Sequence, residues 1–198
     1  MRSLDVLAAT ARRLNREAGS PPLPVLYFFT DPARTPDPVH VAERLPRGAA
    51  VVFRHFGAAN RIEVAQRLVR VCRRRRLVLL VAADPDLARR VRADGVHWPE
   101  RLLRRRASTH WIETAAAHSR AGLDRAARAG MDACVLAPLF PSRSASALSP
   151  LGPLKAGSLA RHAGLPVVAL GGVSARTAKR LVGRGFVGLA AVEALVSD

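Results

Sequence analysis

Two histidines stand where apolar runs of the sequence end, His97 within "GVHW" (95–98) and His118 at the close of "HWIETAAAH" (110–118). Imidazole titrates near neutral pH, so a histidine at the end of a strand can move a proton without a metal ion. Structural roles are open for both: His97 can pack and hydrogen-bond at its strand end, and His118 can hydrogen-bond the backbone beside a helix start. We take His118 as the first candidate catalytic residue.

Arg54, near the end of another apolar run ("AAVVFRHF", 49–56), is the second candidate catalytic residue. A guanidinium group presents several N–H donors that match the oxygens of phosphates and carboxylates. Arg54 therefore either contacts a phosphate group of a ligand or forms an ion pair with Glu113 or Asp94. The sequence leaves both alternatives open.

A glycine pair and a long loop supply candidate anion-binding groups. Gly171 and Gly172 precede Ser174, a typical helix N-cap, so their backbone N–H groups would lie at a helix start, where anions bind. The segment 138–152, within "LAPLFPSRSASALSPLGPLK" (136–155), is longer than most connections in compact domains. It is either a surface connection or a mobile lid, and a lid would present three side chains to a ligand: Ser142, Arg143 and Ser144.

The elements that position these residues are short apolar runs alternating with helical segments. Buried parallel strands are apolar and partly β-branched, and eight runs have that character: 25–31, 49–56, 76–83, 95–98, 110–118, 132–138, 165–172 and 186–192. Helical periodicity is clearest at 60–75, 85–92, 119–129 and 174–184. These helices have N-cap residues and two glycine stops at expected places: Asn60, Asp84, Ser119, Ser174, Gly130 and Gly185.

Eight strands with helices between them predict a closed (β/α)₈ TIM barrel, whose active site lies at the carboxyl ends of the strands. An open doubly wound sheet is the alternative, because the segments around 38–45 and 99–105 are short for helices. Such a sheet normally carries G-x-G-x-x-G after its first strand, and "TDPARTPDP" has no such motif. We therefore expect a barrel over 23–198 and an N-terminal helical extension over 1–22 that packs on it.

The composition limits the partners of the chain. Its 198 residues are 49% hydrophobic, enough for one sizeable core, and its net charge of +17 comes almost entirely from arginine. Arginines gather in "RLVRVCRRRRL" (67–77) and "RLLRRRA" (101–107), where they would attract phosphates, nucleic acid or acidic proteins. Aromatic residues are only 5% and no recognised nucleic-acid motif is present, so nucleic acid is not the expected partner.

The cysteines and the apolar runs indicate the cellular setting. Cys72 and Cys134 have no C-x-x-C spacing, so we expect two buried free thiols. No apolar stretch approaches the roughly 20 residues that span a bilayer, and the first residues lack the apolar core and cleavage site of a signal peptide. We expect a cytoplasmic protein with no membrane partner, and a homodimer is left open.

Five motifs occur in order along the chain: "LYFFTD" (26–31), "ADGVH" (93–97), "AHSRAGLDRAARAGMDACVLAPLFPS" (117–142), "SPLG" (149–152) and "PVVALGGVS" (166–174). Together they resemble the thiamine phosphate synthase family, which also contains the thiazole tautomerases. The resemblance begins near Leu23 and implies a TIM barrel that binds a thiazole phosphate and, in the synthase, a pyrimidine diphosphate with Mg²⁺. It implies either a transferase that makes thiamine phosphate or an isomerase, in which a histidine at the position of His118 moves a proton.

The metal-binding positions that the resemblance implies are altered. The family's Asn-Asp at the end of the third strand corresponds to Ala82 and Ala83. Because Mg²⁺ prefers oxygen ligands, Asp94, which the resemblance places on the metal side, remains as a single candidate ligand. We therefore expect Mg²⁺ to bind poorly if it binds at all.

The diphosphate and phosphate positions are altered too. Of the family's Q-x-R-x-K at the second strand, this chain keeps only Arg54. The family's P-T-x-T-K in the long loop corresponds to "PSRSA" (141–145), which keeps two hydroxyls, adds an arginine and lacks the lysine. After the last strand Glu193 takes the place of a serine, and its negative charge disfavours a neighbouring phosphate. Synthase chemistry is therefore expected to be weak or lost.

Three hypotheses from different classes remain open. The chain is a thiamine-pathway barrel that binds thiazole phosphate or a thiamine phosphate-like ligand, with chemistry closer to the tautomerase. Alternatively it is a non-catalytic barrel that binds such a metabolite and regulates, or a basic adapter whose partner is nucleic acid or an acidic protein.

Overall fold

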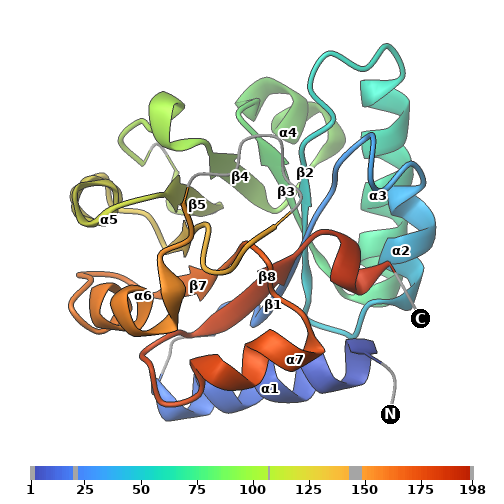
Figure 1. Cartoon of the computed structure of the whole chain (residues 1–198). Coiled ribbons are helices and arrows are strands. Elements are labelled where there is room, and N and C mark those ends of the chain that lie inside the picture. Colours follow the sequence, from blue (N-terminus) through green and yellow to red (C-terminus); the bar gives the residue numbers. More distant parts are fainter. Residues whose placement is uncertain (1–2, 20–21, 107, 143–148, 197–198) are drawn as a thin grey trace.

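The computed structural model describes residues 3–19, 22–106, 108–142 and 149–196. Eight parallel strands form one closed barrel in the order β1 to β8, as Figure 1 shows. The strands are β1 Leu26–Phe29, β2 Ala50–Phe53, β3 Val78–Ala82, β4 Gly95–Trp98, β5 Ile112–Ala117, β6 Ala133–Leu136, β7 Val167–Ala169 and β8 Gly188–Ala191. Barrel closure is made by β1 and β8, where Leu26 pairs with Leu189. The predicted (β/α)₈ barrel is confirmed.

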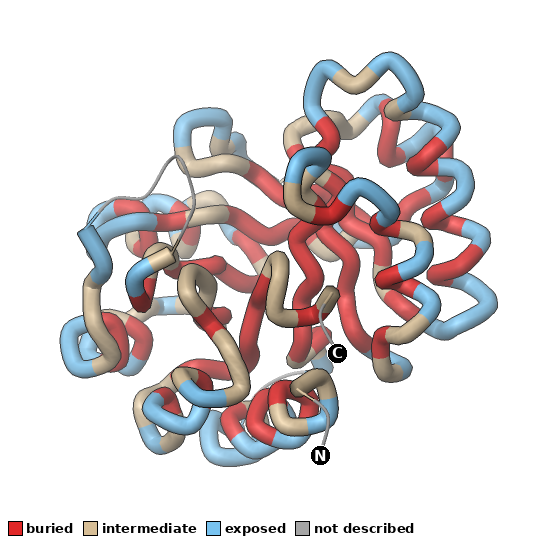
Figure 2. Tube along the Cα trace, turned by 45° about the vertical axis from the view of Figure 1, so that its right-hand side comes forward, coloured by how far each residue is buried: buried red, intermediate tan, exposed pale blue. Residues whose placement is uncertain are grey.

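The strands are almost entirely buried because both of their faces are covered, which explains their continuous apolar sequence. Alternate residues fill the barrel interior, and this inner cluster comprises Tyr27, Phe29, Ala50, Val52, Leu80, Ala82, Val135, Val168, Val187 and Ala190. The other residues of the strands face the surrounding helices and form the larger outer cluster. Figure 2 shows the resulting division, with buried segments in the middle and exposed ones on the outer sides of the helices.

The helices lie outside the barrel and differ greatly in length. They are α1 Ser3–Glu17, α2 Pro38–Arg44, α3 Arg61–Arg75, α4 Pro85–Val91, α5 Arg120–Arg128, α6 Gly152–Arg161 and α7 Ala175–Ala178, with 3₁₀ turns η1 Glu100–Leu102, η2 Lys179–Leu181 and η3 Glu193–Leu195. The expectation of short segments after the first and fourth strands is confirmed by α2 and η1. The predicted helix over 174–184 is wrong, since only one α-helical turn and one 3₁₀ turn form there.

Three of the four predicted N-caps work through their side chains. Asp84 accepts from Leu87 N, Ser119 from Gly122 N, and Ser174 from Thr177 N. Asn60 also stands at the predicted N-cap position, before α3, but its side chain makes no capping hydrogen bond among the described residues. The capped helices α4 and α5 begin after only two loop residues, Ala83–Asp84 and His118–Ser119, and this fixes two short loops at the barrel mouth.

The N-terminal helix α1 packs against α7 and β8, and Figure 1 shows it lying along α7. Asn15 Nδ2 donates to Val187 O at 3.3 Å, and Glu17 Oε2 accepts from Gly183 N at 2.9 Å. Within the described residues, no helix is both long enough and apolar enough to cross a membrane. Cys72 and Cys134 are both buried and free, as expected.

Candidate active site at the barrel mouth

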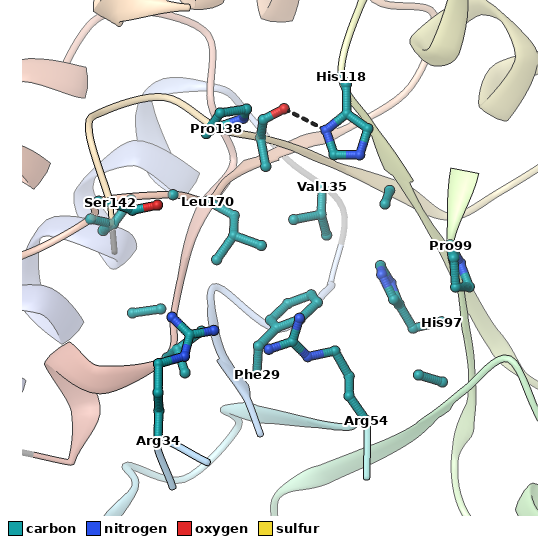
Figure 3. Close-up of a pocket in the computed structure, with 18 of the residues that line it drawn as sticks. Phe29, Arg34, Arg54, His97, Pro99, His118, Val135, Pro138, Ser142 and Leu170 are labelled. Atoms are coloured by element: carbon teal, nitrogen blue, oxygen red, sulfur yellow. Dashed lines mark hydrogen bonds between the residues drawn. The ribbon is translucent and has the colours of Figure 1, made fainter. Parts of the chain in front are cut away.

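A cavity of about 950 Å³ opens at the carboxyl ends of the strands. Its walls combine apolar side chains from the strands with polar groups from the loops that follow them, and Figure 3 shows how these point inward. The residues that the argument uses are Phe29, Arg34, Arg54, His97, His118, Val135, Ser142, Leu170, Gly171, Gly172 and Glu193. The structure thus brings most of the predicted site residues together around one space.

Arg54 is held on one side of the cavity by the loop after β1. Its backbone N donates to Thr30 Oγ1 and its Nε to Thr30 O, both at 2.9 Å, and its guanidinium lies 5.4 Å from the ring centre of Phe29. Burial lowers the pKa of Arg54, and the nearby Asp31 carboxylate opposes that effect. One terminal nitrogen of the guanidinium is buried and has no hydrogen-bond partner among the described residues.

Asp31 links Arg54 to a second arginine of the same loop, Arg34. The Asp31 Oδ2 atom lies 2.7 Å from an Arg34 terminal nitrogen and 3.7 Å from one of Arg54. The other carboxylate oxygen accepts from the backbone N of Ala33 and of Arg34, which fixes the orientation of the carboxylate. The Arg34 side chain also holds the pKa of Asp31 below its usual value. Arg54 therefore pairs with Asp31 and not with Glu113 or Asp94, which corrects the predicted ion-pair partner, while the predicted phosphate contact of Arg54 stays a prediction.

His97 lies deep in the cavity wall. Its Nδ1 is 2.9 Å from Thr114 Oγ1, and its ring meets that of Phe29 edge to face at 5.0 Å. Burial, together with the positive charge of Arg54, lowers the pKa of His97 to about 3. The imidazole is therefore neutral near pH 7 and acts as a fixed polar group in the wall.

His118 lies on the side of the mouth opposite Arg54, and Figure 3 shows its ring beside the segment around Pro138. Its Nδ1 is 2.7 Å from Ala137 O, and because a carbonyl oxygen only accepts, Nδ1 carries the proton. Its backbone N donates to Glu100 Oε2 at 2.9 Å. In the neutral ring Nε2 is then the proton acceptor, so both sequence-based roles of His118, the backbone hydrogen bond and proton transfer, fit its geometry.

Gly171 and Gly172 bring the loop after β7 against the loop after β6. Their φ values are +95° and +61°, and a Cβ at Gly172 would lie 2.4 Å from Pro141 O. Phe140 N donates to Gly171 O at 2.9 Å, which joins the two loops at the cavity edge. The helix that follows, α7, is a single turn, so the anion-binding helix start expected here is much shorter than predicted.

Comparison with known proteins identifies the family of the barrel. A family model described as thiamine monophosphate synthase matches residues 26–195. The chain belongs to this family. The thiamine-phosphate synthase of Alcanivorax borkumensis is 33% identical over 186 residues, covering 86% of this chain and 84% of that protein. That of Bacillus velezensis is 27% identical over 196 residues, covering 92% and 88%.

The fold of the solved structures agrees with this membership of the thiamine monophosphate synthase family. A thiamine phosphate pyrophosphorylase from Pyrococcus furiosus superposes with a TM-score of 0.73 at 24% identity, covering 92% of this chain and 87% of that one. At this identity the likeness shows the common barrel fold. A further thiamine phosphate pyrophosphorylase, from Bacteroides thetaiotaomicron, superposes with a TM-score of 0.59 at 16% identity, covering 86% and 83%.

The Mg²⁺ that this family implies does not fit the residues present. Strand β3 ends in Ala82 and is followed by Ala83, which offer no side-chain oxygen, and the carboxylate of the next residue, Asp84, is taken by Leu87 N and Arg61. Asp94 precedes β4, so it lies at the amino end of that strand, where its Oδ2 accepts from Leu79 N at 2.7 Å. The structure thus does not bring Asp94 to the cavity. Among the residues described, no three His, Cys, Asp or Glu side chains could hold a metal ion together.

The loop after β6 and the loop after β1 each contribute a polar side chain to the cavity wall, Ser142 and Arg34. Ser142 lines the cavity as expected. Arg143 and Ser144 lie outside the described residues. Arg34 was missed by the sequence analysis, although Asp31 followed by Pro and, three positions on, by Arg is a turn pattern that could have suggested an ion pair.

Proposed function

We propose that the chain binds thiazole phosphate or a similar thiamine-pathway phosphate in this cavity, and that its chemistry is proton transfer on the heteroaromatic ring. In this proposal the enzyme is closer to a thiazole tautomerase-like isomerase than to an efficient thiamine phosphate synthase. The observation that carries it is the orientation of His118, whose Nδ1–H is fixed by Ala137 O so that Nε2 is the free base.

The wall of the cavity suits a flat ring. Phe29, Val135 and Leu170 supply apolar surface between the arginine side and the His118 side of the mouth. A ring placed against them would have His118 Nε2 available to take a proton from one ring carbon and return it to another atom of the ring. No atoms are gained or lost in such a step, so it needs neither a leaving group nor a second substrate.

Efficient joining of a thiazole to a pyrimidine diphosphate is disfavoured by the same site. Departure of diphosphate requires its developing negative charge to be neutralised, usually by metal ions and cations. The end of β3 offers only alanine side chains, and the loop sequence 141–145 contains no lysine. We therefore expect slow synthase turnover even with added Mg²⁺.

Ligand binding and proton exchange test the proposal. Thiazole phosphate should raise the melting temperature of the protein, and in ²H₂O the wild type should exchange a ring-bound proton of the ligand, as followed by NMR. His118→Gln should abolish the exchange and keep the binding, while His110→Gln, at an exposed histidine, should change neither. Binding without exchange in the wild type would favour the non-catalytic metabolite-binding barrel, and absence of binding would contradict the proposal.

The basic adapter is less well supported. Three arginines at the end of α3 are occupied within the chain: Arg73 donates to Arg92 O, Arg74 pairs with Glu43, and Arg75 donates to Leu45 O. These arginines are nevertheless exposed to solvent. The adapter is therefore disfavoured by the match to the thiamine monophosphate synthase family and by the low aromatic content, and not by burial of its basic groups.

A further inference from the structure

Among the described residues, three arginines line the cavity, and the function proposed above gives none of them a part in the proton transfer. Arg101 and Leu102 lie on the exposed turn η1, Arg54 follows β2, and Arg34 belongs to the loop after β1. Arg34 is only partly exposed, with 24% of its side-chain surface accessible, and Figure 3 shows its guanidinium pointing into the cavity near that of Arg54. A second cation is thus placed beside the first.

We propose that Arg34 binds the anionic group of the ligand together with Arg54, in place of a metal ion, and that the anion displaces Glu193 from Arg34. This inference rests on the proposed function, because it names the group that recognises the phosphate of the same ligand.

The shared carboxylate of Asp31 holds the two guanidinium groups in place before any ligand arrives. Both have a terminal nitrogen near the same Asp31 oxygen, at 2.7 Å for Arg34 and 3.7 Å for Arg54. Arg34, Arg54 and Asp31 together carry one net positive charge, which the Glu193 carboxylate near Arg34 offsets until an anion displaces it. Guanidinium groups that are already positioned lose little conformational entropy on binding and match phosphate oxygens through paired N–H donors.

The guanidinium of Arg54 can donate a further hydrogen bond to a ligand in this arrangement. Its Nε donates to Thr30 O, whereas the terminal nitrogen that lies 3.7 Å from Asp31 is buried and, in the part of the chain that the structure describes, makes no hydrogen bond. A buried donor left unsatisfied is costly, so an acceptor oxygen brought by the ligand would be favourable.

Glu193 is the group with which the anion would compete. It follows β8, lines the cavity, and its Oε1 lies 4.0 Å from Arg34 Nε, at the limit of an ion pair and longer than the pair of Arg34 with Asp31. A phosphate approaching Arg34 would be repelled by this carboxylate and attracted by the guanidinium. Substitutions at the two positions should therefore change anion affinity in opposite directions.

The test is isothermal titration calorimetry in EDTA with two probes, inorganic pyrophosphate and thiazole phosphate. Arg34→Gln should weaken both probes by about tenfold or more, equivalent to about 1.4 kcal/mol, and Arg34→Lys by less, because it keeps the charge. Glu193→Gln should strengthen binding by about threefold, and much of that gain should vanish when Arg34→Gln is also present. Arg89→Gln, which removes another i, i+3 pair with an aspartate outside the cavity, should have no effect.

Each outcome decides the question, with circular dichroism showing that the variants are folded. If thiazole phosphate binds the wild type and Arg34→Gln stays within twofold of it, the Arg34 inference is wrong and the proposed function stands. If pyrophosphate binding depends on Arg34 but thiazole phosphate does not bind, the anion site is supported and the proposed function is wrong. If the wild type binds neither probe in EDTA nor after Mg²⁺ is added, both are wrong. Binding that occurs only after Mg²⁺ is added would overturn the metal-free part of the Arg34 inference.

Discussion

Acidification should destabilise the folded chain through His97, the imidazole in the cavity wall. In the unfolded chain a histidine has a pKa near 6.5. In the folded chain burial, assisted by the charge of Arg54, lowers the pKa of His97 to about 3. Below pH 6.5 the unfolded chain therefore binds a proton that the folded chain does not bind, and stability falls as the pH drops toward 3.

The size of this effect follows from the two pKa values. Each pH unit between them costs about 1.36 kcal/mol, so moving from neutral pH to pH 4.5 should remove on the order of 2–3 kcal/mol of the free energy of unfolding. At pH 4.5 the folded imidazole is still neutral, because its pKa is about 3. Domains of this kind are stabilised by only about 5–15 kcal/mol, so the loss is a substantial fraction.

The contribution of His97 to the pH dependence of stability can be isolated by urea unfolding. The measurement compares the wild type with His97→Gln at pH 7.5 and at pH 4.5. Glutamine can still hydrogen-bond Thr114 but does not titrate, so the variant should lose on the order of 2–3 kcal/mol less than the wild type over this range. Other groups cancel in the comparison, including the buried His55, whose pKa is also lowered by burial. His40→Gln, at an exposed histidine, is the control. Equal pH dependence in wild type and His97→Gln, or an NMR titration of His97 centred near pH 6.5, would refute the reasoning.

Three further predictions concern the loops and the metal. Gly172→Ala should lower the free energy of unfolding by about 1–3 kcal/mol more than Gly152→Ala, as measured by thermal unfolding. Both glycines have positive φ, but only a Cβ at Gly172 would meet backbone, at Pro141 O. Equal losses of stability would contradict the close approach of the two loops. Asp94→Ala should lower the free energy of unfolding by about 1–3 kcal/mol, because it removes the hydrogen bond that Leu79 N donates to Asp94. The affinity for thiazole phosphate should be unchanged. A loss of that affinity would favour a role of Asp94 in the binding site. Thiamine phosphate formation with Mg²⁺ should stay far below about 10 per second in a coupled assay, and ordinary turnover would disprove this.

The arrangement of the barrel could be predicted because buried parallel strands have an unmistakable sequence pattern. All eight apolar runs became strands, since a strand covered on both faces must be apolar throughout. The helix over 174–184 was overestimated because its apolar periodicity continues past the point where the chain tightens into the 3₁₀ turn η2. Periodicity shows which face is buried, and it does not distinguish an α-helix from a succession of shorter turns.

The candidate site was predicted where position along a strand decides it, and not where a loop decides it. Arg54 and His118 follow strand ends, so the barrel rule alone places them at the mouth. The same rule places Asp94 at the opposite end of the barrel, because Asp94 comes before its strand. The prediction of Asp94 as a metal ligand came from the family resemblance and not from this rule. Arg34 depends on the fold of an irregular loop, which hydrophobic pattern does not encode.

The docking of α1 on β8 and α7 sets the order in which the chain can complete its fold. The hydrogen bond from Asn15 to Val187 joins residues 172 positions apart, so α1 gains its contacts with α7 and β8 only after the rest of the barrel has been made. Until then the buried face of α1, including Leu7 and Leu14, has no complete surface to cover it. A chain that stops before β8 therefore leaves the apolar face of α1 partly exposed and would be a natural target for chaperones and proteases.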